Sequence, residues 1–450
     1  MESEGHASTR KFLTYGMPRL SAAIVLDIID FGILFLYITA YGLHPILPGL
    51  ALAVGKLSIA AGQFLMGWLS DNTKTKYGRR KPFIIFFAPL TALAFICALL
   101  PMIFLQNPTY IILFIWILVW DSMLQFSYGG LTTPYQSWVA EQFIVNERPK
   151  ASAFQNLFSF IGAGVGIVFT LLVFPPLIES FQKTGAIDLI FVILIIAFAL
   201  LLIALFYTCA YVLPVETIEG AQMSFTEDLK KVFKDKNFIK VCWLQAIAFL
   251  AIGMITPTIL GFTTIVLKLE DAPLYFAAVC LIVGITAFLF MWKKLIDKKG
   301  KKSTFSIILL TGIIVLPFTL IGLIPGEIHF LIGIIFVLAI AAFMGGWYLF
   351  PYIWFADLAE DAEVKSGETG RKAGLYAGFP QILLNIFQAI SLFITGFILG
   401  LPNVPGKDFS WGYVLWGLWC SGIILIAYLF TKKFITLDFE WEKEGAIKSK

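Results

Sequence analysis

The chain has 450 residues, of which 59% are hydrophobic and only 14% are charged, and its formal net charge is +4. A soluble globular domain carries about 25% charged residues, and 450 residues form too small an interior to hide this much apolar surface from water. The composition therefore excludes a set of soluble domains and predicts a protein embedded in a lipid bilayer, with no nucleic-acid partner.

Twelve apolar runs follow one another along the chain, and each is long enough to cross a membrane. A span needs about 20 mainly apolar residues, and its backbone groups must pair within the segment, so helices are expected. The polar residues before the first run lack the features of a secretory signal, so that run is expected to be a retained span. The expected spans cover residues 19–41, 43–69, 83–105, 109–138, 152–174, 187–213, 238–266, 272–296, 304–324, 328–355, 374–401 and 410–432.

Lysine and arginine residues gather in alternate loops. The N-terminus, the loops after the even-numbered spans and the C-terminal tail hold nearly all of them, whereas the opposite loops hold only Lys183, Lys268 and Lys407. Loops rich in lysine and arginine stay on the cytoplasmic side. The pattern predicts a multi-pass protein of the plasma membrane with both termini in the cytoplasm.

The chain also repeats one phrase about half its length apart. Gly-Gly, Pro-Tyr, Trp and Ala-acid recur in the same order in the two stretches 129–141 and 345–357. A six-helix unit duplicated without inversion predicts two halves related by a pseudo-twofold axis along the membrane normal, with a solute site between them near the midplane. The expected parts are a first half at 1–213, a cytoplasmic linker at 214–237, a second half at 238–433 and a tail at 434–450.

Three ionisable residues lie inside expected spans at similar depth: Asp30, Lys56 and Asp121. Such a residue costs about 3 kcal/mol at mid-span unless it is paired or hydrated, so it is a functional candidate by default. Acids and a base at one depth can neutralise each other across helices. Asp27 is interpreted as a shallower, structural residue.

Amide, hydroxyl and indole side chains recur at helical spacing on the same helix faces as these charges, or at the same depth in the second half of the chain. Amides bind hydroxyl groups and a flat ring covers the apolar face of a sugar, so these residues suit a hydroxyl-rich solute. Each of them could also simply hold helices together, and for Gln125 or Gln381 alone that is the simpler interpretation. The candidates for solute binding or coupling are Asp30, Lys56, Gln63, Asp121, Gln125, Tyr128, Thr132, Trp347, Gln381, Asn385 and Gln388.

Acids and cations also meet at the expected cytoplasmic ends of the spans. Asp71 ends the second span and is followed by Arg79 and Arg80, with which it can pair to close that side. The alternative is that these cations only mark the inner face and touch lipid phosphates. The candidate gate residues are Asp71, Arg79, Arg80, Glu141, Arg148, Asp297, Asp357 and Arg371.

Several loop sequences resemble a known family. The stretch 67–83, which contains Ser70-Asp71 and Tyr77-Gly78-Arg79-Arg80-Lys81, resembles the loop between spans 2 and 3 of the major facilitator superfamily. The stretches 134–148 and 356–371 are similar to loops of its glycoside–pentoside–hexuronide:cation symporter group, which includes melibiose permease and the plant sucrose carriers. The resemblance implies an all-α major facilitator fold and secondary active transport of a sugar or related polar solute by alternating access, coupled to a cation.

The resemblance carries over to the span residues only in part. Asp30-Phe31 matches the family's acid–aromatic pair for sugar recognition, and Lys56 matches a basic residue of its second helix. The two carboxylates that hold the family's coupling sodium fall at Ile59 and Gln63, its helix-4 acid falls at Thr132 and its helix-11 lysine at Asn385. The coupling cation expected here is therefore a proton rather than sodium, carried by Asp30 or Asp121.

Other function classes are disfavoured to different degrees. The histidines His6, His44 and His329 lie in a tail or at span ends, and no nucleophile–base or metal-ligand pattern is present, so no enzyme, metal or cofactor is expected. A channel or purely structural membrane protein does not account for duplicated halves with mid-span charges. A carrier of lysolipids or other amphiphiles stays open, because 44 phenylalanines would suit it. We expect a monomer whose partners are a small solute, a coupling cation and the lipid bilayer.

Overall fold

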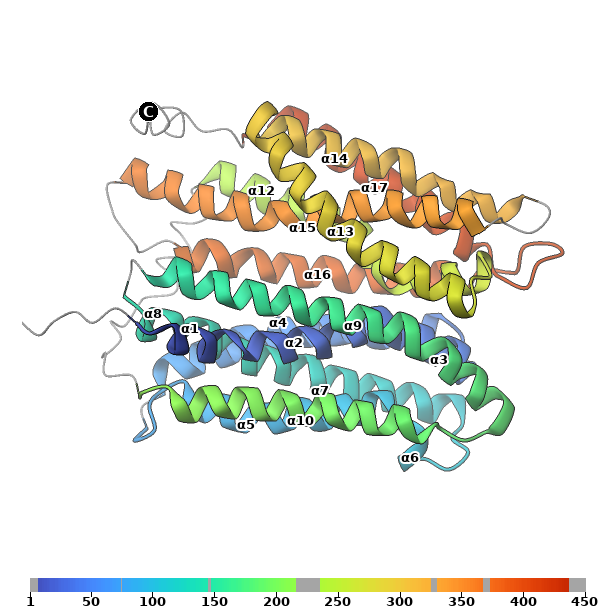
Figure 1. Ribbon diagram of the computed structural model, residues 1–450, viewed down its shortest axis with the longest axis horizontal. Coiled ribbons are helices and arrows are strands. Elements are labelled where there is room, and N and C mark those ends of the chain that lie inside the picture. The colour runs from blue at the N-terminus through green and yellow to red at the C-terminus, as the bar shows by residue number, and fades with distance from the viewer. Residues whose placement is uncertain are drawn as a thin grey trace, which may run out of the picture. The chain divides into compact units, whose positions relative to one another are not determined.

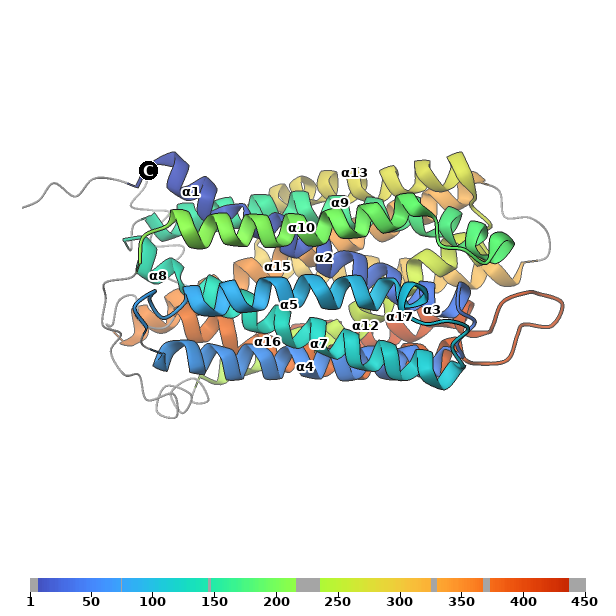
Figure 2. The same ribbon diagram turned by 90° about the horizontal axis from the view of Figure 1, so that it is seen from below.

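The computed structural model describes residues 7–73, 75–144, 147–215, 235–324, 330–366 and 373–436. The chain divides into two compact units, Met1–Ala221 and Gln222–Lys450, here called unit 1 and unit 2. The division falls inside the expected linker at 214–237, most of which lies outside the described residues, as does the tail beyond residue 436. Figures 1 and 2 show the long, roughly parallel helices of each unit.

Nearly all described residues are helical. Unit 1 contains α1 (Thr9–Gly16), α2 (Pro18–Ile28), η1 (Ile29–Ile33), α3 (Leu34–Thr39), α4 (Ile46–Asn72), α5 (Lys81–Leu99), α6 (Pro101–Phe104), α7 (Tyr110–Ser137), α8 (Val139–Gln142), α9 (Arg148–Thr184) and α10 (Leu189–Val212). Unit 2 contains α12 (Lys236–Gly261), η3 (Phe262–Val266), α13 (Asp271–Lys299), α14 (Lys301–Val315), η4 (Leu316–Leu323), α15 (Phe330–Ser366), α16 (Ala373–Leu399) and α17 (Gly412–Phe434). Twelve helices of the described chain are long and apolar enough to cross a membrane, which confirms the expected number of spans.

The first span begins at Thr9, so the start expected at residue 19 is wrong. The Ser8 side chain caps the helix by accepting a hydrogen bond from the Lys11 backbone N–H. The Phe12 ring is buried and stacks on Phe143 at 5.0 Å, which gives this polar stretch an apolar face to bury. Arg19 therefore lies inside the first span rather than at its start.

Glycines bring α4 and α7 into backbone contact, and α7 is the main packing partner of α4 (Figure 2). A Cβ at Gly129 of α7 would lie 2.7 Å from the Ile59 carbonyl oxygen of α4. Small residues at helix interfaces allow this close approach inside membranes. Gly162 and Gly166 of α9 meet α2 in the same way, since a Cβ at either position would press on the α2 backbone. The interior of unit 1 is thus held by two close helix pairs, α4–α7 and α2–α9.

Replacing Gly129 with alanine is expected to destabilise unit 1 by about 1 to 3 kcal/mol, because the added methyl overlaps the α4 backbone, which cannot move aside as a side chain can. Gly164→Ala is the matched control, since that glycine also lies within a helix but has nothing within 4 Å of the new Cβ. Alanine there is expected to be neutral or slightly stabilising. The measurement is the unfolding midpoint of both variants in detergent, and equal midpoints would contradict the packing argument.

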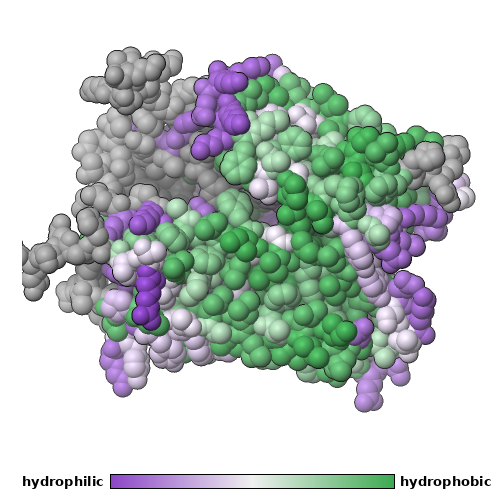
Figure 3. All heavy atoms as spheres, in the orientation of Figure 1, coloured by the Kyte–Doolittle hydropathy of each residue, from purple (hydrophilic) through white to green (hydrophobic). Residues whose placement is uncertain are grey.

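The outer surface of the helices is apolar, as a bilayer requires. Hydrophobic residues cover most of the face visible in Figure 3, and hydrophilic residues gather at the helix ends. Exposed side chains such as Leu189, Ile190 and Leu200 on α10 are 59 to 70% accessible although they are fully apolar. Together with the spans, this surface shows a multi-pass membrane protein.

Candidate functional site

The mid-span charges of unit 1 form a buried ion pair. Lys56 on α4 donates from Nζ to Oδ1 of Asp30 at 2.6 Å, and the side chains are 4% and 18% exposed. Asp30 lies in η1, a π-helical turn within the first span. Such turns carry one extra residue per turn and are frequent at functional sites. The base of the second span is therefore neutralised across helices by an acid of the first span.

Asp121 on α7 lies at the same depth as this pair. With a rise of about 1.5 Å per residue, Asp30, Lys56 and Asp121 are each about 14 to 16 Å from the span ends at Thr39, Ile46 and Tyr110. The carboxyl of Asp121 packs against Gly55, the residue before Lys56, where a Cβ would overlap it. We call Asp30, Lys56 and Asp121 the charged core.

The carboxyl of Asp121 differs from that of Asp30 in having no hydrogen-bond partner. Asp121 is 0% exposed, and neither carboxyl oxygen makes a hydrogen bond of regular geometry, although the Gln125 side chain lies close enough to act on it. Gln125, one helical turn further along α7, is 1% exposed, and its amide oxygen and nitrogen are likewise unpartnered. Buried polar atoms are normally hydrogen-bonded, so two adjacent unpartnered side chains require an explanation.

The other polar residues predicted on these faces continue along α7 and α4 from the charged core. Tyr128 and Thr132 are buried on the same side of α7 as Asp121 and Gln125. Thr132 donates to the Tyr128 carbonyl oxygen of its own helix at 2.7 Å, so its hydroxyl is already satisfied. Gln63 is half-buried on α4, two turns from Lys56.

The predicted residues of unit 2 have different surroundings. Trp347 on α15 is 1% exposed and packs among aromatic rings, with centroids 5.6 Å from Phe249 and 6.1 Å from Trp354. On α16, Gln381 is exposed, Asn385 is buried and Gln388 is half-buried. The indole of Trp347 is therefore part of the unit 2 core.

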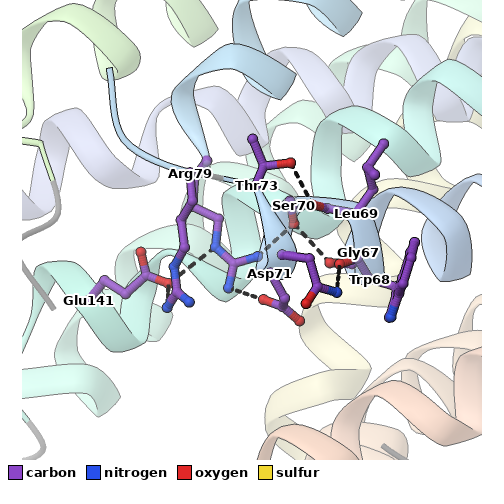
Figure 4. Close-up of polar contacts among 10 residues, drawn as sticks. Gly67, Trp68, Leu69, Ser70, Asp71, Thr73, Arg79 and Glu141 are labelled. Atoms are coloured by element: carbon purple, nitrogen blue, oxygen red, sulfur yellow. Dashed lines mark hydrogen bonds and ion pairs between the residues drawn. The ribbon is translucent and has the colours of Figure 1, made fainter. Parts of the chain in front are cut away.

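A second charged cluster lies where α4 ends and α5 and α8 begin (Figure 4). Arg80 bonds Oδ1 of Asp71 at 2.5 Å, Oγ of Ser70 at 2.6 Å and Oε1 of Glu141 at 3.1 Å. Arg79 reaches the same Glu141 oxygen at 2.5 Å. Glu141 is 4% exposed and Arg80 is 5% exposed, whereas Asp71 is 58% exposed. We call Ser70, Asp71, Arg79, Arg80 and Glu141 the basic-end cluster.

The remaining predicted gate residues are only partly brought together. In unit 2, Lys301 bonds Asp357 at 2.6 Å, which reproduces in simpler form the pairing of Arg79 with Glu141. Arg148 donates from Nε to the Phe143 carbonyl oxygen at 3.2 Å. Asp297 is exposed on α13, and Arg371 lies outside the described residues.

The sequence pattern does not single out Arg19 and Lys81, because each lies at the edge of an apolar run, where cations are expected to mark the cytoplasmic side. Arg19 lies within the first span and donates to Oγ of Ser159 on α9 at 3.4 Å, with the Tyr128 hydroxyl also within its reach. Lys81 is 8% exposed and donates to the Leu213 carbonyl oxygen at 2.7 Å, at the end of α10. Arg19 directly follows Pro18, at the start of α2.

The geometry of unit 1 supports reversible charge movement. One base lies between two buried acids, bonded to Asp30 and close enough to Asp121 to act on it electrostatically. A lysine head on its flexible stem can change partner without backbone movement. The set can therefore take up or release a cation at the centre of the membrane span.

Comparisons with known proteins agree with this architecture. The sequence model of the family described as MFS/sugar transport protein matches residues 14–411. An uncharacterized symporter of Synechocystis is 24% identical over 192 residues, which cover 40% of this chain. The matched stretch spans only about a third (33%) of that protein's length.

Solved transporter structures share the fold. A nucleoside transporter, NupG, superposes with a TM-score of 0.63 at 14% identity, covering 95% of this chain and 100% of its own. A D-xylose–proton symporter superposes with a TM-score of 0.62 at 13% identity, covering 95% and 96% of the two chains. The twelve-span, all-α major facilitator fold is thereby confirmed, and these similar proteins are transporters rather than enzymes.

Proposed function

This chain belongs to the MFS/sugar transport protein family, and we propose that it is a secondary active transporter that moves a sugar or related polar solute by alternating access, together with a proton. The single observation that carries the proposal is the charged core: a buried ion pair beside a buried, unpartnered carboxyl at mid-span depth. Charges at this depth are costly, so they are retained for work on a solute or an ion.

The polar groups around the charged core support a hydroxyl-rich solute. The amide of Gln125 is unpartnered and can both donate to and accept from a sugar hydroxyl. Tyr128 adds a phenol and a ring face on the same side of α7. In unit 2 we propose Asn385 and Gln388 as further solute contacts.

The ion pair itself favours a proton over sodium. Sodium is a hard cation that needs several oxygen ligands, as calcium and magnesium do. At Asp30 the ammonium of Lys56, 2.6 Å away, already occupies one carboxylate oxygen and repels a second cation. The positions of the family's two sodium-binding carboxylates hold Ile59, which is 4% exposed and apolar, and Gln63.

We propose that the basic-end cluster faces the cytoplasm of the plasma membrane and closes that side of unit 1. Arg80 and Glu141 are buried there although both carry charge, so the cluster holds α4, α5 and α8 together. The loop charges support the orientation, with both termini cytoplasmic. We further propose that the two units are the six-helix halves of a monomer.

Purified protein in proteoliposomes is expected to accumulate at least one of radiolabelled D-xylose, melibiose and sucrose when an inward proton gradient is imposed. A gradient of about one pH unit stores about 1.4 kcal/mol, which supports about a tenfold accumulation if one proton moves with each solute. Lysophosphatidylcholine is the comparison substrate for an amphiphile carrier. Uptake that needs sodium and ignores pH would rule out proton coupling, and uptake of the lysolipid alone would rule out a sugar.

A further inference from the structure

We infer that Asp121 is the residue that carries the transported proton, and that Asp30 forms a standing ion pair with Lys56. The inference rests on the proton coupling proposed above and decides between the two acids of the charged core. It is carried by the contrast between their carboxyl groups: that of Asp30 is bonded to an ammonium at 2.6 Å, and that of Asp121 is fully buried with no hydrogen-bond partner.

Charge balance leads to the assignment. One base and two acids are neutral together only when one acid holds a proton. The carboxylate of Asp30 is in direct contact with the Lys56 ammonium, which stabilises its ionised form, so the proton belongs on Asp121. An ionised carboxylate without a partner in an apolar interior is far more costly than its neutral form, and Asp121 has both conditions, complete burial and no partner. In this conformation Asp121 therefore holds the proton.

The packing around Asp121 also provides for release of the proton. Gly55 lets the carboxyl lie directly against α4 beside Lys56, whose ammonium already acts on it electrostatically. The amide of Gln125 is unpartnered on the same helix face and can donate to a carboxylate. While Lys56 stays bonded to Asp30, its ammonium and the Gln125 amide are both in place to stabilise the ionised form of Asp121.

The other titratable groups near Asp121 offer its carboxyl neither a hydrogen-bond donor nor a further positive charge, which is consistent with a neutral carboxyl. Tyr37 of α3 donates to the Ala98 carbonyl oxygen at 2.9 Å and so offers no donor to Asp121. From α5 the nearby group is the thiol of Cys97, which neighbours Tyr37. From the first span, Asp30 is paired with Lys56, and Asp27 interacts electrostatically with Asp30, Lys56 and, more weakly, Arg19. Lys56 is thus the cation that faces Asp121 from the packed elements.

Infrared difference spectroscopy of the purified protein tests the assignment without a solute. At neutral pH, the spectrum of wild type minus Asp121→Asn is expected to show the C=O stretch of a protonated carboxyl, sensitive to exchange into D₂O. The difference spectrum of wild type minus Asp30→Asn is expected to lack this C=O band. If the Asn variant does not fold, Asp121→Glu should move the band to the position of a glutamic acid. A missing band in the Asp121 difference, or its presence in the Asp30 difference, overturns the assignment.

Transport separates this inference from the proposed function. In proteoliposomes, Asp121→Asn is expected to keep measurable exchange of labelled D-xylose, melibiose or sucrose, whichever of them the wild type accepts, and to lose the part of its uptake that depends on the proton gradient. Its proton-driven accumulation should fall from about tenfold to none. Accumulation that survives in Asp121→Asn overturns the assignment and leaves proton-coupled transport standing. Sodium-driven accumulation by the wild type overturns the proposed coupling itself.

Discussion

Lys56→Met is expected to lower the free energy of unfolding by about 3 to 5 kcal/mol and to abolish accumulation of solute. The substitution removes the ammonium that bonds Asp30 at 2.6 Å, while the side chain of the remaining acid is only 18% exposed. Removing one partner of a buried pair costs this much because the other charge stays buried without compensation. The measurements are unfolding in detergent and uptake into proteoliposomes.

The double variant Asp30→Asn with Lys56→Met separates stability from coupling. Because neither charge is left buried alone, most of the lost stability should return, and the difference measures the interaction between the two residues. Accumulation should stay absent, since the base that responds to the proton is gone. Lys183→Met is the control: Lys183 pairs with Glu179, but both side chains are more than 60% exposed, at 69% and 66%. It should leave the unfolding midpoint unchanged. A double variant that regained accumulation would show that the pair is only structural.

The helical architecture was predictable because a bilayer leaves a chain few choices. Every backbone group in the span must be paired, so long apolar runs become helices, and the twelve expected runs correspond to the twelve observed spans. The boundaries were less predictable where a polar stretch buries one face against its neighbours. Residues 9–18 begin the first span because Phe12 finds a buried aromatic partner in Phe143, which no local pattern reveals.

The charged core was predictable in its members but not in its pairing. Equal depth in three spans follows from counting residues, and this placed Asp30, Lys56 and Asp121 together. Which acid the base bonds depends on the rotation of each helix, which is set by glycine contacts such as Gly129 against the Ile59 carbonyl. The same limit explains Trp347, where the indole suggested a sugar platform but faces Phe249 and Trp354 in the unit 2 core.

Arg80→Met is expected to lower the free energy of unfolding by about 3 kcal/mol and to reduce uptake strongly, through loss of the basic-end cluster. Arg80 is the centre of that cluster because its guanidinium bonds Ser70, Asp71 and Glu141 at once. Without it, Glu141 stays 4% exposed with Arg79 as its remaining ion-pair partner in the cluster. Losing a buried partner of a charge is the costly change.

The exposed and buried contacts of Arg80 should contribute unequally, and two variants separate them. Asp71→Asn removes an ion pair whose acid is 58% exposed, so solvent screening limits the loss to about 1 kcal/mol or less. Arg80→Lys keeps the charge but loses the planar guanidinium, and one ammonium cannot reproduce three directed contacts. Its loss of stability should therefore lie between those of Asp71→Asn and Arg80→Met. Unfolding midpoints and initial uptake rates of the three variants give the order. If Asp71→Asn lost as much unfolding stability as Arg80→Met, the stabilising contact would be the one to the exposed acid. The cluster would then not depend on the buried bonds from Arg80 to Ser70 and Glu141.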